Sequence, residues 1–200
     1  MTLLVLASGT AHAAGIDGRL GITGQLGFTA AAKSSYTREF VRANGLSDDA
    51  LRPEAAFVGG GGLIFGLTRN LALEAGALYL ANDYDNSGAK ALRITAADVS
   101  LGLQLRNNVS EELAAYLGCG VDVLLSDVED ANGNEGDAET VVGGHVNVGG
   151  DYFVTRRIAL NFDLRGLLFP EADLKSGGVT VARYNPVSFV GLVGVRFFLN

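Results

Sequence analysis

The 200-residue chain has little of several residue types, and each shortage excludes a class of protein. Its one cysteine, Cys119, cannot form an intrachain disulfide, and apolar neighbours at alternate positions predict a small packing residue. Three prolines beside 28 glycines are typical of a strand-rich protein, not of a disordered one. Fifteen basic and 22 acidic residues, a formal charge of −7, leave no basic patch, so we expect no nucleic-acid partner.

Long apolar runs are also missing, although the mean hydropathy of +0.26 is high for a soluble protein. The longest candidate, residues 55–67, is too short for a membrane-spanning helix and contains five glycines. If the chain crosses a membrane, it must therefore do so with strands. The length suits one domain with a full core, and no linker divides it.

Eight segments of the chain alternate between apolar and polar residues. A period of two places each set on its own face of a strand, so the sequence predicts eight β-strands. The pattern is clearest in three of them, at residues 16–28, 158–165 and 187–199. At residues 92–105 the apolar positions move from even to odd numbers near Ala96 and Ala97, which predicts a β-bulge. The second segment is apolar on both faces, and its glycines at 59–62 are expected to admit bulky neighbours or allow bending.

The seven connections between these segments alternate between long and short. The short ones are residues 68–70, 106–112 and 155–157, and the long ones are residues 31–54, 82–90, 126–139 and 169–185. Every long connection therefore falls at one end of the strands and every short one at the other. This sorting predicts an all-β, eight-stranded antiparallel up-and-down transmembrane β-barrel, with tight turns on one side of the membrane and large polar loops on the other.

Alternation alone does not say which face points into the barrel. A soluble lipocalin-type barrel encloses its apolar face, whereas a membrane barrel turns that face toward lipid. Strand length, a continuous apolar band and polar faces with charges of both signs all favour lipid. The charges expected inside are Asp17, Arg19, Glu74, Asp98, Arg106, Asp122, Asp151, Asp163, Arg165 and Arg196. Tryptophan is absent, and the aromatic residues expected to form the interfacial girdles in its place are Phe28, Phe57, Tyr79, Tyr152, Phe169, Phe189 and Phe197.

The N-terminus favours export. Residues 1–13 read as a truncated or partial signal peptide, because a short apolar run precedes a small-x-small site at Ala11-His12-Ala13. The usual basic opening region is missing, so Met1 is either an internal start or lies downstream of the true N-terminus. Residues 14–200 then form the barrel domain.

His145 is the one histidine in the expected mature chain. It lies on the polar face of its strand, with Asn147 and Asp151 at alternate positions. A lipid-modifying enzyme would need a nucleophile or activated water, a base and an orienting group together. No serine or threonine on the adjacent strands pairs with it convincingly, so a hydrogen-bonded histidine in the lumen is the preferred interpretation. We assign no catalytic, cofactor-binding or metal residues.

Two long connections have compositions that bear on binding. Residues 127–139 hold six carboxylates, and Asp130, Asn132 and Asn134 have the first spacings of a calcium loop. The glycine of that motif is displaced by Glu135 and its closing glutamate is missing, so a solvated loop is preferred over a dedicated site. Weak bridging of divalent cations to lipopolysaccharide phosphates stays open. The first long connection, residues 31–54, mixes charged and apolar residues and is compatible with a short helix.

Two segments carry a resemblance to a known family, Leu71-Ala-Leu-Glu-Ala-Gly-Ala-Leu-Tyr and Gly149-Gly-Asp-Tyr-Phe-Val-Thr-Arg-Arg-Ile-Ala-Leu. With them, residues 14–200 resemble the small outer-membrane barrels of the OmpA/OmpX-like superfamily. The closing strand, residues 187–199, is similar to the terminal signal read by the barrel-assembly machinery, although the chain ends Leu199-Asn200 and not on an aromatic residue. The resemblance implies a bacterial outer-membrane location and this machinery as a partner.

From these observations we expect a monomeric barrel with both termini in the periplasm, in contact with outer-membrane lipid and lipopolysaccharide. Eight strands leave a narrow or plugged lumen, so general porin activity is not expected. The preferred role is non-enzymatic: envelope structure or surface interaction through the long loops, without a cofactor. Two alternatives stay open, a lipid-A-modifying outer-membrane enzyme and a soluble periplasmic lipocalin-like binding barrel.

Overall fold

A computed structural model describes residues 15–44, 49–86, 89–130, 135–138, 140–176 and 179–199. The expected signal peptide at residues 1–13 lies outside these ranges, so its assignment stays a prediction. Within them, no helix has the length and hydropathy of a membrane-spanning segment.

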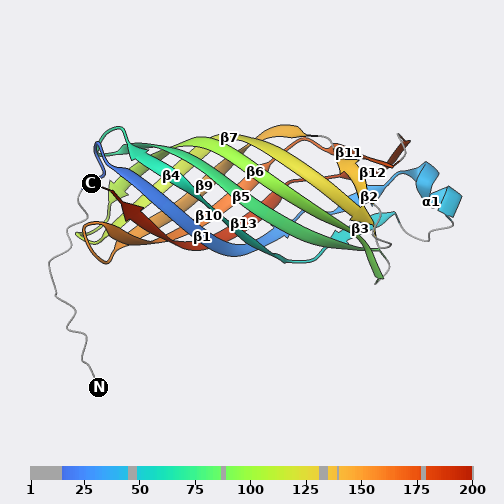
Figure 1. Ribbon diagram of the computed structural model, residues 1–200, viewed down its shortest axis with the longest axis horizontal. Coiled ribbons are helices and arrows are strands. Elements are labelled where there is room, and N and C mark those ends of the chain that lie inside the picture. The colour runs from blue at the N-terminus through green and yellow to red at the C-terminus, as the bar shows by residue number, and fades with distance from the viewer. Residues whose placement is uncertain are drawn as a thin grey trace, which may run out of the picture.

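Eight long strands form the wall of a closed barrel, and each pairs antiparallel with both of its neighbours (Figure 1). In ring order they are β1 (Leu20–Ala31), β4 (Ala56–Gly66), β5 (Leu71–Asn86), β6 (Ala89–Asn108), β7 (Leu113–Asp130), β9 (Val141–Phe153), β10 (Ile158–Leu168) and β13 (Ser188–Phe198). The pairing of β1 with β13 closes the ring, so the predicted fold class is confirmed.

Three tight turns close one end of the barrel, at residues 67–71, 109–113 and 154–158. In each, a hydroxyl accepts a hydrogen bond from the backbone N–H three residues later: Thr68 from Leu71 at 3.1 Å, Ser110 from Leu113 at 3.1 Å and Thr155 from Ile158 at 3.0 Å. The three turns share one sequence pattern: an apolar residue, then Ser or Thr, two variable residues and a second apolar residue. Ser or Thr is suited to the second position because its hydroxyl accepts a hydrogen bond from a backbone N–H of the turn. We call this the turn end. The three predicted short connections are confirmed there, except that residues 106–108 of the second one belong to strand β6 (Ala89–Asn108).

At the opposite, loop end the wall continues as shorter strands. These are β2 (Ser34–Tyr36), β3 (Ala50–Pro53), β8 (Glu135–Ala138), β11 (Ala172–Ser176) and β12 (Val179–Tyr184). Together with the loop-end parts of β5, β6 and β7 they form a second closed ring, in the order β5, β3, β2, β12, β11, β8, β7, β6. We call this ring the crown. The expectation that the long connections are loops is therefore wrong over much of their length.

One helix, α1 (Arg38–Asn44), lies within the first long connection and projects beyond the crown (Figure 1). It confirms the short helix expected there. Thr37 begins it, since its hydroxyl accepts a hydrogen bond from the Phe40 N–H at 3.4 Å. The rings of Tyr36 and Phe40 stack with their centroids 4.9 Å apart, which fixes the helix against β2.

The bulge predicted at Ala96 and Ala97 is wrong. Ala96 pairs with Leu80 and Ala97 with Tyr79 in an unbroken register, and the irregularity between β5 and β6 falls at Tyr84 and Asp85 instead. Even-numbered residues of β6 face the interior throughout its described side chains. The change in the apolar pattern therefore comes from the interior itself, which is apolar near the loop end and polar lower down.

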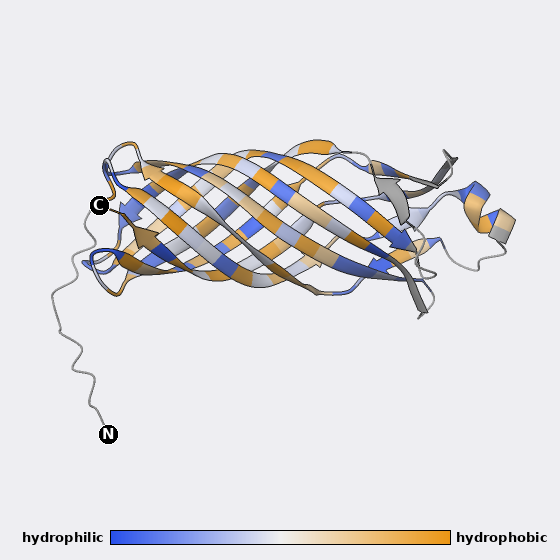
Figure 2. Ribbon diagram, in the orientation of Figure 1, coloured by the Kyte–Doolittle hydropathy of each residue, from blue (hydrophilic) through white to orange (hydrophobic). Residues whose placement is uncertain are grey.

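The outer surface between the two ends is apolar, and Figure 2 shows hydrophobic and hydrophilic residues alternating along the wall strands. Leu160, Phe162 and Val195 are 41%, 52% and 50% exposed on this surface, whereas Asp163 and Arg196 are buried inside. The predicted inversion of polarity is confirmed in this zone, which we call the membrane belt.

The expectations for the positions of four residues are corrected. Cys119 is exposed on the outer surface and is not a buried packing residue. Phe169 is buried in the crown core, so it belongs to no girdle. Asp17 is exposed at the turn end and Arg19 lies at the mouth of the barrel over the Phe198 ring, 4.6 Å from its centroid, because β1 begins only at Leu20.

Aromatic girdles nevertheless form without tryptophan. Phe28, Phe57, Tyr79 and Phe189 are exposed at the loop-end edge of the belt, and Tyr152 and Phe197 are exposed at its turn-end edge. Aromatic side chains of this kind mark the level of the two lipid interfaces.

Candidate functional site

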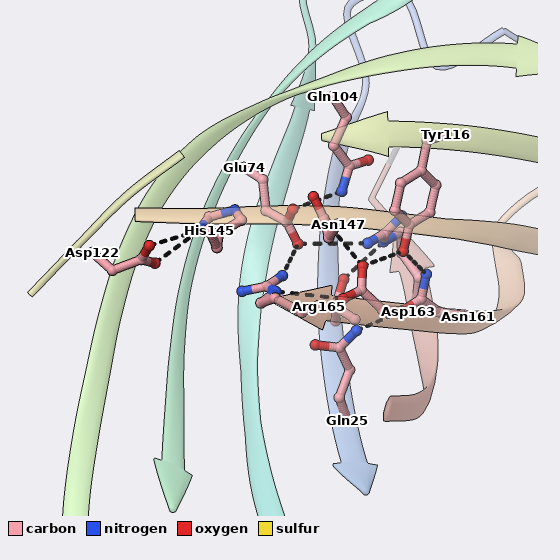
Figure 3. Close-up of polar contacts among 12 residues, drawn as sticks. Gln25, Glu74, Gln104, Tyr116, Asp122, His145, Asn147, Asn161, Asp163 and Arg165 are labelled. Atoms are coloured by element: carbon pink, nitrogen blue, oxygen red, sulfur yellow. Dashed lines mark hydrogen bonds and ion pairs between the residues drawn. The ribbon is translucent and has the colours of Figure 1, made fainter. Parts of the chain in front are cut away.

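Polar side chains from the wall strands meet in the middle of the lumen (Figure 3). Asp151 of β9 accepts hydrogen bonds from Arg106 of β6, from Nη1 of Arg196 at 2.5 Å and from Asn161 at 2.8 Å. Both arginines and the aspartate are almost fully buried. Two guanidinium groups on one carboxylate give a charged contact that water does not screen.

Tyr116 of β7 links this contact to a second carboxylate. Its hydroxyl donates to Asp163 at 2.8 Å and accepts from the amide of Asn161 at 3.1 Å. Asn147 of β9 also donates to Asp163, at 2.6 Å. The tyrosine ring lies beneath the guanidinium of Arg106, 5.1 Å from ring centroid to Cζ, so Tyr116 contacts charges of both signs.

Glu74 of β5 completes the group from the opposite wall. Gln104 donates to it at 2.6 Å, and the guanidinium groups of Arg165 and Arg196 lie 3.7 and 3.9 Å from its Oε1 atom. These contacts connect β5 and β6 with β10 and β13 across the lumen, although the two pairs of strands are distant in sequence. We call these residues, with Asp151, Tyr116 and their partners, the luminal network.

His145 lies beside this network and pairs with Asp122 of β7, whose carboxylate oxygens are 2.8 and 3.0 Å from Nδ1 (Figure 3). The sequence placed Asn147 and Asp151 near the histidine, but both point to other partners. Asp122 was missed as its partner because that contact depends on the register between β7 and β9, which pairs His145 with Gly120. A Cβ atom added at Gly120 would lie 2.5 Å from the imidazole Cε1 atom, so glycine there leaves room for the ring.

A carboxylate that orients an imidazole is one half of a hydrolytic site. Here the pair is buried on the inner face of the wall, 4% and 1% exposed, and does not face lipid. An enzyme acting on membrane lipid would need those groups on the opposite face of β7 and β9. The geometry therefore agrees with a structural histidine in the lumen.

The luminal network and its neighbours combine charges of both signs, with more carboxylates than guanidinium groups. Among the described residues, the buried or half-buried groups are Glu74, Asp98, Asp122, Asp151 and Asp163 against Arg106, Arg165 and Arg196. Burying an unpaired charge is strongly unfavourable, so opposite charges placed together are what allows a charged interior. The predicted pairing inside the barrel is confirmed for Asp151 and Asp163, which bond to arginines, and Asp122 pairs with His145. It is not confirmed for Asp98, whose two carboxylate oxygens are buried without a hydrogen-bond partner among the described residues.

Apolar clusters flank the network on both sides. Toward the turn end lie Ile16, Ile64, Ala72, Ala114, Phe153, Ala159 and Phe198, with the rings of Phe153 and Phe198 stacked 5.6 Å apart. Toward the loop end a larger cluster continues into the crown, where Tyr84 and Tyr184 meet edge to face at 6.2 Å. Burial raises the pKa of Tyr84, which lies in the crown, to about 12. Both clusters separate the charged groups from the ends of the barrel.

The described parts of the acidic connection lie on β7 and β8, which pair with Asp127 opposite Asp137 and Glu129 opposite Glu135. Asn132 and Asn134, and the side chain of Asp130, which supplied the calcium-loop spacing, lie outside the described residues. Within the described part of the chain, no group of three or more His, Cys, Asp or Glu residues is arranged to hold a metal ion.

An apolar belt between aromatic girdles, a charged interior and a closed ring of antiparallel strands define a transmembrane β-barrel, in which every backbone polar group of the wall is paired within the barrel. The chain belongs to the family described as outer membrane protein beta-barrel domain, whose model matches residues 1–197. It is therefore a protein of the bacterial outer membrane, and the resemblance to small outer-membrane barrels is confirmed.

Solved structures of other outer-membrane barrels are similar to this fold. The outer membrane protein OprG of Pseudomonas aeruginosa matches with a TM-score of 0.73 at 15% identity, over 92% of this chain and 97% of OprG. Neisserial surface protein A matches with a TM-score of 0.60 at 16% identity, over 90% and 97%. The N-terminal barrel domain of Pseudomonas aeruginosa OprF matches with a TM-score of 0.53 at 14% identity, over 92% and 98%. No curated protein matches in sequence.

Proposed function

We propose that this protein is a non-enzymatic outer-membrane barrel that acts in envelope structure or surface interaction through its crown. The observation that carries this proposal is the division of polar groups between the lumen and the crown. In the lumen they bond to one another between two apolar clusters. In the crown they are exposed at the end of the barrel that this class of protein turns away from the cell.

The crown offers a surface suited to contact. A pocket of about 380 Å³ lies between β2, α1 and β12, and Arg38 and Arg183 line it together with Glu39 and Asp49. Loops and strand ends held by a rigid scaffold are common positions for binding residues. Because the pocket has charges of both signs, a polar partner is favoured over an apolar one.

A charge-reversal experiment tests this role. Cells that display the protein would be compared with cells that display Arg38→Glu/Arg183→Glu, using binding to immobilised extracellular-matrix proteins and glycans. The matched control is Arg69→Glu/Arg156→Glu at the turn end. We expect binding to fall with the crown variant and to be unchanged in the control. Equal binding by all three proteins, or no binding beyond that of cells lacking the protein, would overturn the proposal.

The lipid-A-modifying alternative has one specific observation in its favour, the Asp122–His145 pair. Purified protein and the variant His145→Ala would be assayed for release of fatty acid from lipid A. A non-enzymatic barrel gives no release above background with either protein. Release by the wild type that the variant lacks would replace the proposal with an enzyme.

The same proposal includes the assembly and surroundings of the barrel. We infer a monomer, since the ring closes within one chain, with the belt in contact with outer-membrane lipid and lipopolysaccharide. The closing strand β13, which ends at Phe198, is the segment offered to the barrel-assembly machinery. Chemical crosslinking in membranes tests the monomer, and a dominant dimer band would contradict it.

A further inference from the structure

The strand pairing is irregular at the loop-end edge of the belt, where β3 and β4 meet β5. Pro53 of β3 pairs with Tyr84, and Val58 of β4 pairs with Leu80. Residues 54–57 therefore lie opposite residues 81–83, which is one residue more on the first strand. An extra residue of this kind is a β-bulge, and it re-aims side chains and opens the pairing locally.

A pocket of about 470 Å³ lies on the wall at this bulge. We call it the wall notch. Phe57 and Tyr79, both 57% exposed, form its sides toward the membrane belt. Gly59 follows Phe57 on the outer face of β4 and pairs with Tyr79 of β5. A Cβ atom there would lie 3.2 Å from Cδ2 of Leu26 and 3.8 Å from Cε1 of Phe57, so the floor of the notch at Gly59 is backbone bordered by these side chains.

The rim of the notch toward the crown is charged. Arg93 of β6 and Asp83 of β5 lie on it, with Glu54 from the bulge. The Nε atom of Arg93 is 3.9 Å from Oδ1 of Asp83, and their side chains are 46% and 35% exposed. At this distance and exposure the ion pair is weak, so the guanidinium remains able to receive an anion.

Aromatic girdles place the boundary between hydrocarbon and headgroups at the level of Phe57 and Tyr79. The notch therefore spans that boundary, with an apolar half in the acyl region and a charged half among headgroups. A molecule that fits both halves has an acyl chain and a polar head joined at the interface.

We propose that the wall notch binds an acylated glycolipid with a phosphorylated sugar headgroup. The acyl chain lies over Gly59 between Phe57 and Tyr79. The phosphate accepts hydrogen bonds from the planar fork of Arg93, which suits phosphate oxygens. Sugar hydroxyls donate to the carboxylates of Glu54 and Asp83, groups that would repel an anionic lipid lacking hydroxyl donors nearby. The inference uses the position of the barrel in its membrane and is independent of the role proposed for the crown.

Native mass spectrometry of the full chain in detergent tests the proposal. The probe is bisphosphorylated lipid A, compared with dephosphorylated lipid A, with phosphatidic acid, whose headgroup has no sugar or glycerol hydroxyl, and with inorganic phosphate as a competitor. We expect one lipid A to bind per barrel, dephosphorylation to weaken binding at least tenfold, and phosphatidic acid to bind at least tenfold more weakly than the probe. Millimolar phosphate that displaces the lipid completely would assign the site to free phosphate and overturn the proposal.

Two variants separate the two halves of the notch. Ala81→Phe fills the apolar half from the outer face of β5, and Arg93→Gln removes the cation. Each is expected to weaken binding of lipid A about tenfold. Arg156→Gln, an exposed arginine at the turn end, is the matched control and should bind as the wild type does. Both residues face outward, and heat-modifiable migration on a gel checks that each variant folds. Folded variants that bind lipid A as tightly as the control would refute the site.

Discussion

The membrane belt and the crown are built from the same wall, but they bury opposite kinds of side chain. In the belt, Asp163 and Arg196 are buried and Phe162 is exposed. In the crown, Leu51 and Tyr84 are fully buried, and Arg183 is exposed. The backbone pairing is continuous between the two zones, so the difference is in the surroundings of the barrel and not in its topology.

This difference shows that strand alternation follows the solvent outside the wall. Where lipid surrounds the barrel, apolar residues gain nothing by facing inward, and the polar ones must pair in the lumen. Where water surrounds it, the usual burial of apolar surface determines which face points inward. The change occurs over a few residues: β6 has Ile94 and Ala96 inside above Asp98, all on the same face.

The largest expected effect comes from breaking the lumen of the belt. Asp151→Ala removes the carboxylate that Arg106 and Arg196 share and leaves two buried cations without it. Losing one partner of a buried charged contact lowers the free energy of unfolding by about 3–5 kcal/mol. Urea unfolding in phospholipid vesicles, followed by circular dichroism, measures the loss. Asp17→Ala at the exposed turn end is the control and should change the free energy by less than about 0.5 kcal/mol. A similar result for both would mean that the network does not stabilise the barrel.

A charged substitution tests whether the outer face of the belt contacts lipid. Leu164 of β10 is 50% exposed in the lipid-facing surface, so Leu164→Arg should lower the free energy of unfolding by about 2–4 kcal/mol. Thr95→Arg places the same side chain on the outside of β6 above the girdle, where we expect less than about 0.5 kcal/mol. The same unfolding assay compares the two. Equal losses would place the lipid boundary elsewhere and remove the distinction between belt and crown.

Much of the belt could be predicted from the sequence because each rule there is local. The period of two assigned Leu160 and Asp163 to opposite faces of their strand. The lengths of the connections showed which of them lie at each end of the barrel. Contacts across the lumen could not be predicted in the same way. The partner of His145 is Asp122 on a neighbouring strand, and register between strands does not follow from the pattern along one strand.

The crown could not be predicted for a different physical reason. Its strands are short, and their alternation is interrupted at Pro53, Glu54 and Pro186, so the long connections resemble polar loops. Pairing in a second ring stabilises strands that are too short to be recognised individually. The bulge predicted at Ala96 is wrong for a related reason: the interior beside β6 changes from apolar in the crown to polar in the belt, so the apolar pattern changes while the register does not.

The core of the crown is expected to respond separately from the belt. Leu51 of β3 is fully buried there, and Leu51→Ala should lower the free energy of opening the crown by about 2–3 kcal/mol, at the low end for a buried leucine. Hydrogen exchange of the crown amides should accelerate, while the amides of β10 in the belt keep their protection. The conservative variant Leu51→Met is the control and should be nearly neutral. Acceleration in both zones would show that they unfold as one unit.

The smallest effect, about 1.4 kcal/mol at pH 11, is expected from pH and belongs to the crown alone. The pKa of Tyr84 is raised by burial to about 12, above its ordinary value of 10.0, because the apolar core disfavours the phenolate. A folded state that holds its proton more tightly than the unfolded state is fully stabilised below pH 10 and loses that stability as pH rises from 10 to 12, by about 1.4 kcal/mol per pH unit. Hydrogen exchange, corrected for its intrinsic pH dependence, should therefore show the crown opening above pH 10 while the belt stays closed.

The variant Tyr84→Phe should reduce this pH dependence of the crown. The part that remains is due to Tyr184, because burial also raises the pKa of Tyr184. An unchanged pH profile in Tyr84→Phe would contradict the assignment of the effect to the crown core.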